Sequence, residues 1–110
     1  MSNKTSAAIT GVAGYVPDYV LTNEELEKLV DTNDEWITTR SGISARHFAA
    51  ENELTSDLAV KAAQAALMSA GITSEDLDLI ILSTSTPDHL GGFPSTACVV
   101  QDKLGAHTAC

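Results

Sequence analysis

The chain has 110 residues and carries 15 acidic against 6 basic side chains, a net charge of −9. This balance argues against binding to nucleic acid or an anionic membrane surface, because both depend on clustered Lys and Arg. Hydrophobic residues make up 44% of the chain and aromatic residues 5%, and no segment has the roughly 20 apolar residues that span a bilayer. The sequence therefore predicts a soluble, cytoplasmic, globular chain with an aliphatic core.

The first predicted element is a strand over residues 6–15. This segment is small and apolar, β-branched Ile9 favours a strand, and Pro17 ends it. Gly11 and Gly14 would let another backbone approach the strand closely, and a bulge near the strand end explains them equally well.

Two short helices with clear start signals come next. Thr22 can accept a hydrogen bond from the backbone of Glu25, whose side chain can reach back to the cap. The residues Thr-Asn-Asp-Glu at 32–35 repeat this pattern, with Thr32 in the capping position, and Gly42 is placed to end the second helix. Much of the acidic charge falls in the first turns of these helices, where the helix dipole favours it.

A longer helix is predicted from Thr55 to Gly71, and its many alanines favour close packing against a neighbouring element. After a turn at 73–76, residues 77–82 form an unbroken apolar run, which is typical of a strand buried on both faces of a parallel sheet. The polar loop at 83–88 follows the carboxyl end of that strand, where open α/β sheets build sites.

The last predicted helix begins at residues 93–95, with Pro94 in an early position, and ends at Gly105. The order of strand, helices, buried strand and helix predicts the opening of an α/β layered fold.

Residues that could carry chemistry are scattered along the chain: His47, His89, His107, Cys98 and Cys110. Their spacing fits neither a metal site nor a disulfide framework. Asp88 could orient the neighbouring His89, although the pattern favours a pair of solvated loop residues. Cys98 falls inside the last helix, where a buried small hydrophobe is the default role.

Trp36 is the single tryptophan, and Arg40 lies four residues later on the same helix face. An indole beside a guanidinium can stack on a flat heterocycle while the cation meets a phosphate. A tryptophan packed in the core beside a solvated arginine is the alternative.

The stretch 31–43, followed by Arg46 and His47, closely resembles the β-ketoacyl-acyl-carrier-protein synthase III family. Three further blocks occur in the family's order, at residues 55–71, 78–88 and 93–105. The resemblance implies the N-terminal part of a thiolase-like layered αβα fold with an incomplete parallel or mixed sheet. Residues 1–110 would form part of the first thiolase-like half, with the C-terminal half absent.

Membership would imply the initiating condensing enzyme of type II fatty-acid synthesis, an acyltransferase and normally a homodimer. Such an enzyme joins an acyl-CoA, for example acetyl-CoA, to malonyl-acyl-carrier protein in a decarboxylating Claisen condensation. A cysteine carries the acyl group as a thioester, and a histidine and an asparagine stabilise the later enolate-type state. The resemblance implies neither a metal nor a further cofactor.

Four residues of this chain match family positions with binding or shaping roles. Trp36 resembles the tryptophan that stacks on the CoA adenine, Arg40 the arginine beside it, and Thr32 a neighbouring nucleotide contact. Phe93 resembles the loop aromatic that reaches across the dimer and bounds the partner's acyl pocket.

The chain's last residues, Thr108, Ala109 and Cys110, imitate the family's small-small-Cys signature. Only four residues separate Gly105 from Cys110, too few for both a connection and a strand of about five residues. We therefore expect no catalytic residue in this chain, with the nucleophile and the His/Asn pair beyond residue 110 and the isolated chain inactive. The alternatives are a related CoA-using condensing or acyl-transfer enzyme of secondary metabolism, and a non-catalytic, independently folding binding domain.

Overall fold

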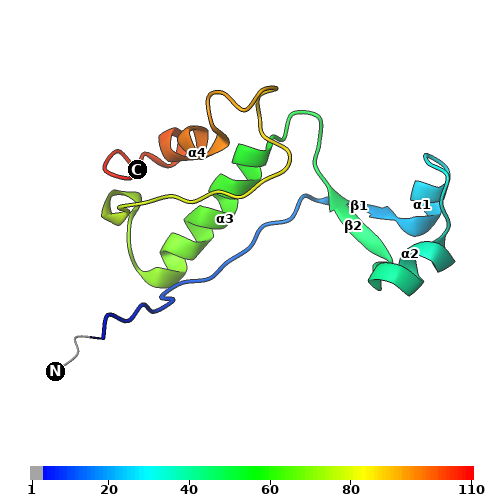
Figure 1. The fold of residues 1–110 in the computed structure, drawn as a ribbon, viewed down its shortest axis with the longest axis horizontal. Helices are drawn as coiled ribbons and strands as arrows, with labels where there is room; N and C mark the ends of the chain where they lie inside the picture. Colours follow the sequence, from blue (N-terminus) through cyan, green and yellow to red (C-terminus); the bar gives the residue numbers. More distant parts are fainter. Residues whose placement is uncertain (1–3) are drawn as a thin grey trace. The chain divides into compact units, whose positions relative to one another are not determined.

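The computed structural model describes residues 4–110, which divide into two compact units (Figure 1). One unit is a single continuous segment, Val16–Leu54. The other combines the N-terminal segment up to Tyr15 with Thr55–Cys110. No helix among residues 4–110 has both the length and the apolar character needed to cross a bilayer.

The 16–54 unit is built on a short antiparallel ribbon. Strand β1 (Tyr19–Thr22) pairs with strand β2 (Ala45–Phe48), and helices α1 (Asn23–Glu27) and α2 (Asp34–Ser41) lie between them in sequence. Leu21 of β1 is buried, with 5% of its surface exposed. Neither strand is predicted from the sequence, because four-residue strands are too short to show a clear alternation of apolar and polar side chains.

The predicted capping box opens α1. The Glu25 backbone N–H donates to Thr22 Oγ1 at 3.2 Å, and the Thr22 N–H donates to Glu25 Oε2 at 3.0 Å. At α2 the predicted cap is wrong by one residue, since Asn33 and not Thr32 occupies the N-cap position. Asparagine is the better cap because its short side-chain carbonyl reaches the free N–H groups of the first turn. The predicted stop is confirmed at Gly42, where φ is +71°.

In the other unit, helix α3 (Thr55–Ala70) and helix α4 (Thr96–Leu104) pack together, with the short 3₁₀ helix η1 (Ser74–Asp76) between them in sequence. The predicted bounds of α3 and the predicted end of α4 at Gly105 are confirmed, but the predicted start of α4 at residues 93–95 is wrong, since the helix begins at Thr96. The N-cap of α4 is Ser95, so Pro94 precedes the helix and does not occupy its first turn. Val100 on α4 is 2% exposed and contributes to the small core.

Two predicted strands, at residues 6–15 and 77–82, are not strands in the structure. Nor is the second segment buried, since Leu79 is 60% exposed and Ile81 84% exposed. A strand is defined by its hydrogen-bonded neighbour, and residues 4–110 supply no neighbour along the length of either segment.

The one backbone pairing of the 77–82 segment joins it to the last residue. The Ile80 N–H donates to the Cys110 carbonyl and the Cys110 N–H donates to the Asp78 carbonyl, both at 3.0 Å. This alternation around Leu79 is the pattern of a parallel ladder. The parallel character predicted for this segment is thus present at a single position.

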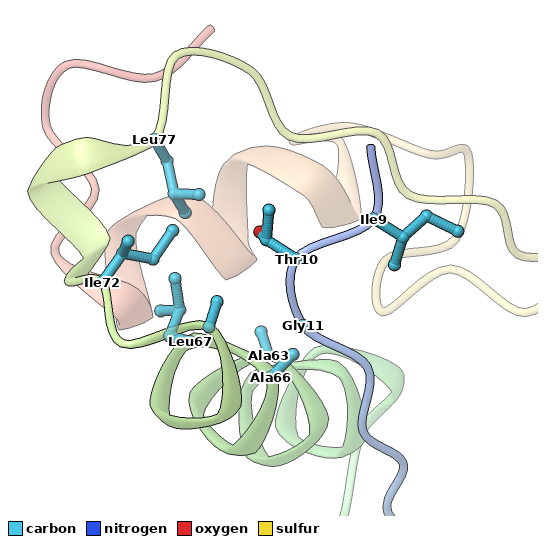
Figure 2. Close-up of a pocket in the computed structure, with 9 residues that line it drawn as sticks. Ile9, Thr10, Gly11, Ala63, Ala66, Leu67, Ile72 and Leu77 are labelled. Atoms are coloured by element: carbon cyan, nitrogen blue, oxygen red, sulfur yellow. The ribbon is translucent and has the colours of Figure 1, made fainter. Parts of the chain in front are cut away.

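The close backbone approach predicted at Gly11 is confirmed. A Cβ atom there would lie 2.6 Å from the Ala66 carbonyl oxygen and 2.8 Å from Ala70 Cβ, both on α3. Figure 2 shows the extended segment through Gly11 crossing α3 beside an apolar hollow of about 250 Å³. Gly14 has no atom within 4 Å of the same position, so close approach does not explain it.

Candidate functional site

Helix α2 presents an aromatic ring and a cation together on the protein surface. The guanidinium carbon of Arg40 lies 4.8 Å from the centroid of the Trp36 ring, within cation–π range. Trp36 is 54% exposed, so the alternative of a tryptophan packed in the core is wrong for the structure described. One face of the indole is covered by Arg40, and more than half of the side chain remains open to a ligand.

A hollow of about 350 Å³ adjoins the indole, and it is lined by Asp31, Thr32, Asn33 and Trp36. Two of the residues predicted to contact CoA, Thr32 and Trp36, therefore line one hollow, and the third, Arg40, contacts the same indole. The arrangement offers a flat stacking surface, a hydroxyl and a fixed positive charge, which suits a heterocycle carrying phosphate groups. The carboxylate of Asp31 can accept hydrogen bonds from amino or hydroxyl groups of such a ligand.

None of the residues of α2 is buried, so polar contacts and not apolar packing hold this helix in place. Asn33 Oδ1 accepts from the Trp36 backbone N–H at 2.8 Å and so fixes the residue that carries the indole. Glu27 Oε1 accepts from the Asp34 N–H at 2.5 Å and ties α1 to the start of α2. Asn23, for which the sequence predicts no role, is 2% exposed and bonds to Asp34. Its only signal in the sequence was its place directly after the capping residue Thr22.

Phe93, the fourth predicted site residue, belongs to the other unit. It is 87% exposed, and Leu90 on the same loop is fully exposed. The structure thus brings Thr32, Trp36 and Arg40 together, and it presents Phe93 as an uncovered aromatic ring on a loop before α4.

The loop that leads to Phe93 is anchored at the N-terminal ends of two helices. Thr55 Oγ1 donates to the Thr86 carbonyl at 2.6 Å, and the Ser56 N–H donates to Asp88 Oδ1 at 2.9 Å. The Asp88 N–H donates to Thr96 Oγ1 at 3.2 Å, which connects the loop to α4.

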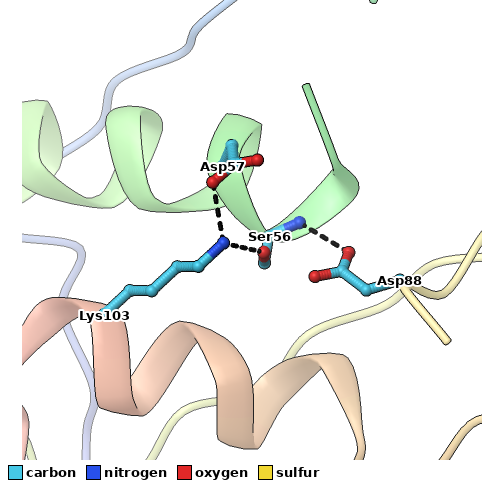
Figure 3. A network of polar contacts seen from close by, with 4 residues as sticks. All are labelled: Ser56, Asp57, Asp88 and Lys103. Carbon is cyan, nitrogen blue, oxygen red and sulfur yellow. Dashed lines mark hydrogen bonds and ion pairs between the residues drawn. The ribbon is translucent and has the colours of Figure 1, made fainter. Parts of the chain in front are cut away.

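Figure 3 shows how this anchor continues into a network across α3 and α4. Lys103 Nζ donates to Ser56 Oγ at 2.6 Å and pairs with Asp57 Oδ1 at 2.7 Å. The second carboxylate oxygen of Asp88 is buried without a hydrogen-bond partner among the described residues. Asp88 is therefore a structural tie. The two roles expected from the sequence, an orienter for His89 and a solvated loop residue, are therefore both wrong for Asp88.

Both cysteines are exposed. Exposure of Cys98 contradicts the predicted buried role, because the start of α4 faces solvent at this position; Ser95 Oγ lies 3.4 Å from Cys98 Sγ. Within residues 4–110, no hydrogen bond joins either sulfur to a histidine, and no group of three His, Cys, Asp or Glu side chains could hold a metal ion.

Comparison with known proteins shows strong similarity to one group of enzymes. The chain is 56% identical over 101 residues to β-ketoacyl-[acyl-carrier-protein] synthase III of Thiobacillus denitrificans. The crystal structure of 3-oxoacyl-[acyl-carrier-protein] synthase III from Aquifex aeolicus matches with a TM-score of 0.81 and 52% identity, covering 92% of this chain. The priming β-ketosynthase of the R1128 polyketide pathway matches with a TM-score of 0.73 and 29% identity over 93% of this chain. No family model matches the chain.

These matches cover nearly all of this chain and a smaller part of the relatives. The chain spans about a third of their length, 31% of the Thiobacillus protein and 32% of the Aquifex chain. The predicted fold, an N-terminal piece of a thiolase-like layered fold, is confirmed by these structural matches.

Proposed function

Because the chain belongs to the β-ketoacyl-acyl-carrier-protein synthase III family, we propose that it supplies the CoA-contacting segment of an initiating condensing enzyme of fatty-acid synthesis. The observation that carries this proposal is the juxtaposition of Trp36 and Arg40 beside the hollow that Thr32 lines. The adenine of an acyl-CoA stacks on the open part of the indole, and Arg40 attracts the nucleotide phosphates.

The proposed reaction has two stages. A cysteine thiolate attacks the thioester carbonyl of an acyl-CoA, and CoA leaves as the thiolate while the acyl group stays on the enzyme. Malonyl-acyl-carrier protein then loses CO₂, and the resulting enolate attacks the acyl thioester and releases the cysteine. In this scheme the residues of α2 hold the CoA so that its thioester reaches the nucleophile, a positioning effect that needs no bond chemistry from them.

We place the nucleophile outside residues 4–110. Cys110 is exposed, and its backbone pairs with Asp78 and Ile80 in the alternation of a parallel ladder beside the 77–82 segment. A reactive cysteine needs a helix N-terminus or a neighbouring cation to lower its thiol pKa. Cys110 lies in this backbone pairing and not at the N-terminus of any helix among residues 4–110, so we propose that these residues alone are inactive in condensation.

Phe93 is proposed to complete a binding pocket in a second copy of the protein. The ring is 87% exposed and follows two loop glycines in left-handed conformations, Gly91 and Gly92. An exposed aromatic on an anchored loop gains its burial from a partner surface, which supports a homodimer. The acyl-carrier-protein substrate and a cytoplasmic location belong to the same proposal.

A related condensing enzyme of secondary metabolism is the second candidate. The similarity to the priming ketosynthase favours it, since that structure shares 29% identity with the chain. Both candidates use the same CoA-contacting residues and differ in the acceptor and in the preferred starter group.

Fluorescence of Trp36 tests the CoA site directly, because Trp36 is the single tryptophan among the 110 residues. We expect CoA to quench it, and phosphopantetheine, which lacks the adenine nucleotide, to leave it unchanged. Equal quenching by both compounds would contradict adenine stacking.

Labelled acetyl-CoA, added with malonyl-acyl-carrier protein to the protein at its full gene-encoded length, tests the reaction. We expect an acyl-enzyme thioester and a labelled condensation product. Binding of CoA with neither of these would instead favour a non-catalytic binding domain. A thioester formed by the isolated 110 residues would overturn the proposed absence of the nucleophile.

A further inference from the structure

A buried asparagine lies at the centre of the 16–54 unit. Asn23, the first residue of α1, is 2% exposed, and its backbone N–H donates to the Ser44 carbonyl at 3.0 Å. Its side chain reaches three separate segments through four hydrogen-bonding contacts: Nδ2 to Asp34 Oδ1 at 2.6 Å, Nδ2 to the Ile43 carbonyl at 2.9 Å, Nδ2 to Thr38 Oγ1 at 3.5 Å, and Oδ1 from Arg46 Nη2 at 2.6 Å.

These contacts require an amide. The Nδ2 group donates to a carboxylate and a carbonyl, and Oδ1 accepts from a guanidinium, so donors and acceptor are all used. A carboxylate in this place would present an acceptor to Asp34 and Ile43, which are acceptors themselves. A buried polar group that loses its partner is costly, so the site distinguishes Asn from the nearly isosteric Asp.

The hydrogen bonds from Asn23 reach one face of α2. Asp34 and Thr38 are four residues apart and share a face, and Thr38 Oγ1 also donates to Asp34 Oδ1 at 3.2 Å. Trp36 and Arg40 are shifted from them by two residues, which is about 200° around a helix of 3.6 residues per turn. The indole and guanidinium therefore project from the face opposite the one that Asn23 holds.

We infer that Asn23 is a positioning residue for the nucleotide site. Its hydrogen bond to Asp34 fixes the rotation of α2 about its axis. The hydrogen bond from Arg46 of β2 in turn holds the Asn23 side chain in place. No buried apolar side chain of α2 performs this task. This inference rests on the proposed CoA-contacting role of Trp36 and Arg40.

The test is Asn23→Asp in the protein at its full gene-encoded length, with Asn52→Asp as the matched control. Asn52 is exposed in a turn of the same unit, so the control adds the same charge without touching the network. In Asn23→Asp we expect KM for acyl-CoA to rise about tenfold, with kcat changed less than about twofold, because a small displacement of a binding group weakens binding without altering the chemical step. The control should match the unmodified protein.

A reciprocal exchange separates positioning from general damage. In the double variant Asn23→Asp with Asp34→Asn, the new amide at 34 can donate to the new carboxylate at 23, and Arg46 keeps its acceptor. We expect KM to return to within about threefold of the unmodified value, a coupling that independent sites would not show.

Three results would overturn the inference: an unchanged KM in folded Asn23→Asp, equal losses in kcat and in the affinity for both substrates, or failure of both the single and the double variant to fold. The last would assign Asn23 to folding alone. Trp36→Ala tests the premise, the proposed CoA site, separately from the role of Asn23. If that variant leaves KM for acyl-CoA unchanged, the proposed CoA site is wrong whatever Asn23 does. If it raises KM and Asn23→Asp does not, only the positioning role fails.

Discussion

The guanidinium carbon of Arg40 stands 4.8 Å from the centroid of the Trp36 ring, one helical turn away on α2. The cation contacts the π-face of the indole, and its five N–H donors make no hydrogen bond within residues 4–110, so they can bind a phosphate. An aromatic stacking surface and a phosphate-binding charge thus come from two residues of a single eight-residue helix.

Replacing Trp36 with Ala should weaken CoA binding by ~1–3 kcal/mol, the usual worth of a base stacked on an aromatic side chain. Isothermal titration of the full-length protein with CoA measures the change. Phe48→Ala is the matched control, since Phe48 is also a half-exposed aromatic of the 16–54 unit, at 56%. Equal effects of the two substitutions would contradict a specific stacking role.

Replacing Gly11 with Ala should destabilise the unit that contains α3. The new methyl group would meet the Ala66 carbonyl oxygen at 2.6 Å, and overpacking of this kind costs about 1–3 kcal/mol. Chemical denaturation followed by circular dichroism gives the free energy of unfolding. Gly14→Ala serves as the control, because a Cβ there meets nothing within 4 Å. A Gly11 variant as stable as the Gly14 variant would refute the close contact.

Replacing Asn33 with Ala should cost about 1 kcal/mol of stability, because the N-cap of α2 loses the acceptor for the Trp36 N–H. Thr32→Ala should cost little, although the sequence pattern placed the cap at that residue. Thermal unfolding of the two variants compares them under one condition. A larger loss for Thr32→Ala would restore the cap expected from the sequence.

Asp76 should contribute to the loss of folding stability at acidic pH. Hydrogen bonds from the Thr73 backbone N–H, and then from its hydroxyl, hold the pKa of Asp76 below its ordinary value, with slight desolvation opposing them. A carboxyl whose folded pKa is depressed stabilises the fold above its unfolded pKa, and this contribution is lost as the pH falls through the folded pKa.

Thr73→Ala removes the hydroxyl and keeps the backbone donor, so it should raise the pKa of Asp76 only part of the way to its ordinary value. Titration of the Asp76 carboxyl by NMR measures both pKa values. Thr5→Ala provides the control, as Thr5 is exposed near the described N-terminus. No change in the pKa of Asp76 on Thr73→Ala would show that the hydroxyl does not contribute.

Local signals in the sequence predicted helices and their ends well. The capping box at Thr22 and Glu25 and the stop at Gly42 are each decided within a few residues, so sequence spacing contains the necessary information. The cap at Asn33 was missed by one position because Thr32 and Asn33 are both good caps, and the backbone conformation chooses between them.

Pairing between distant segments could not be predicted in the same way. β1 and β2 are separated by two helices, and neither four-residue strand shows alternation. The 77–82 segment carries the apolar composition of a buried strand, but burial depends on neighbours, and only Cys110 pairs with it here. Asn23 was missed for a related reason, since its partners lie 11 to 23 residues away.

The acidic first turns of α1 and α2 have an electrostatic consequence for any nucleotide that approaches Trp36. Residues 16–54 hold nine acidic and three basic side chains, so the unit that carries the proposed CoA site holds most of the chain's acidic residues. Long-range forces there repel an anionic ligand, and Arg40 attracts it only at short range. Salt shortens the reach of the repulsion. Association should therefore speed up with ionic strength, opposite to the electrostatic steering of basic nucleotide sites.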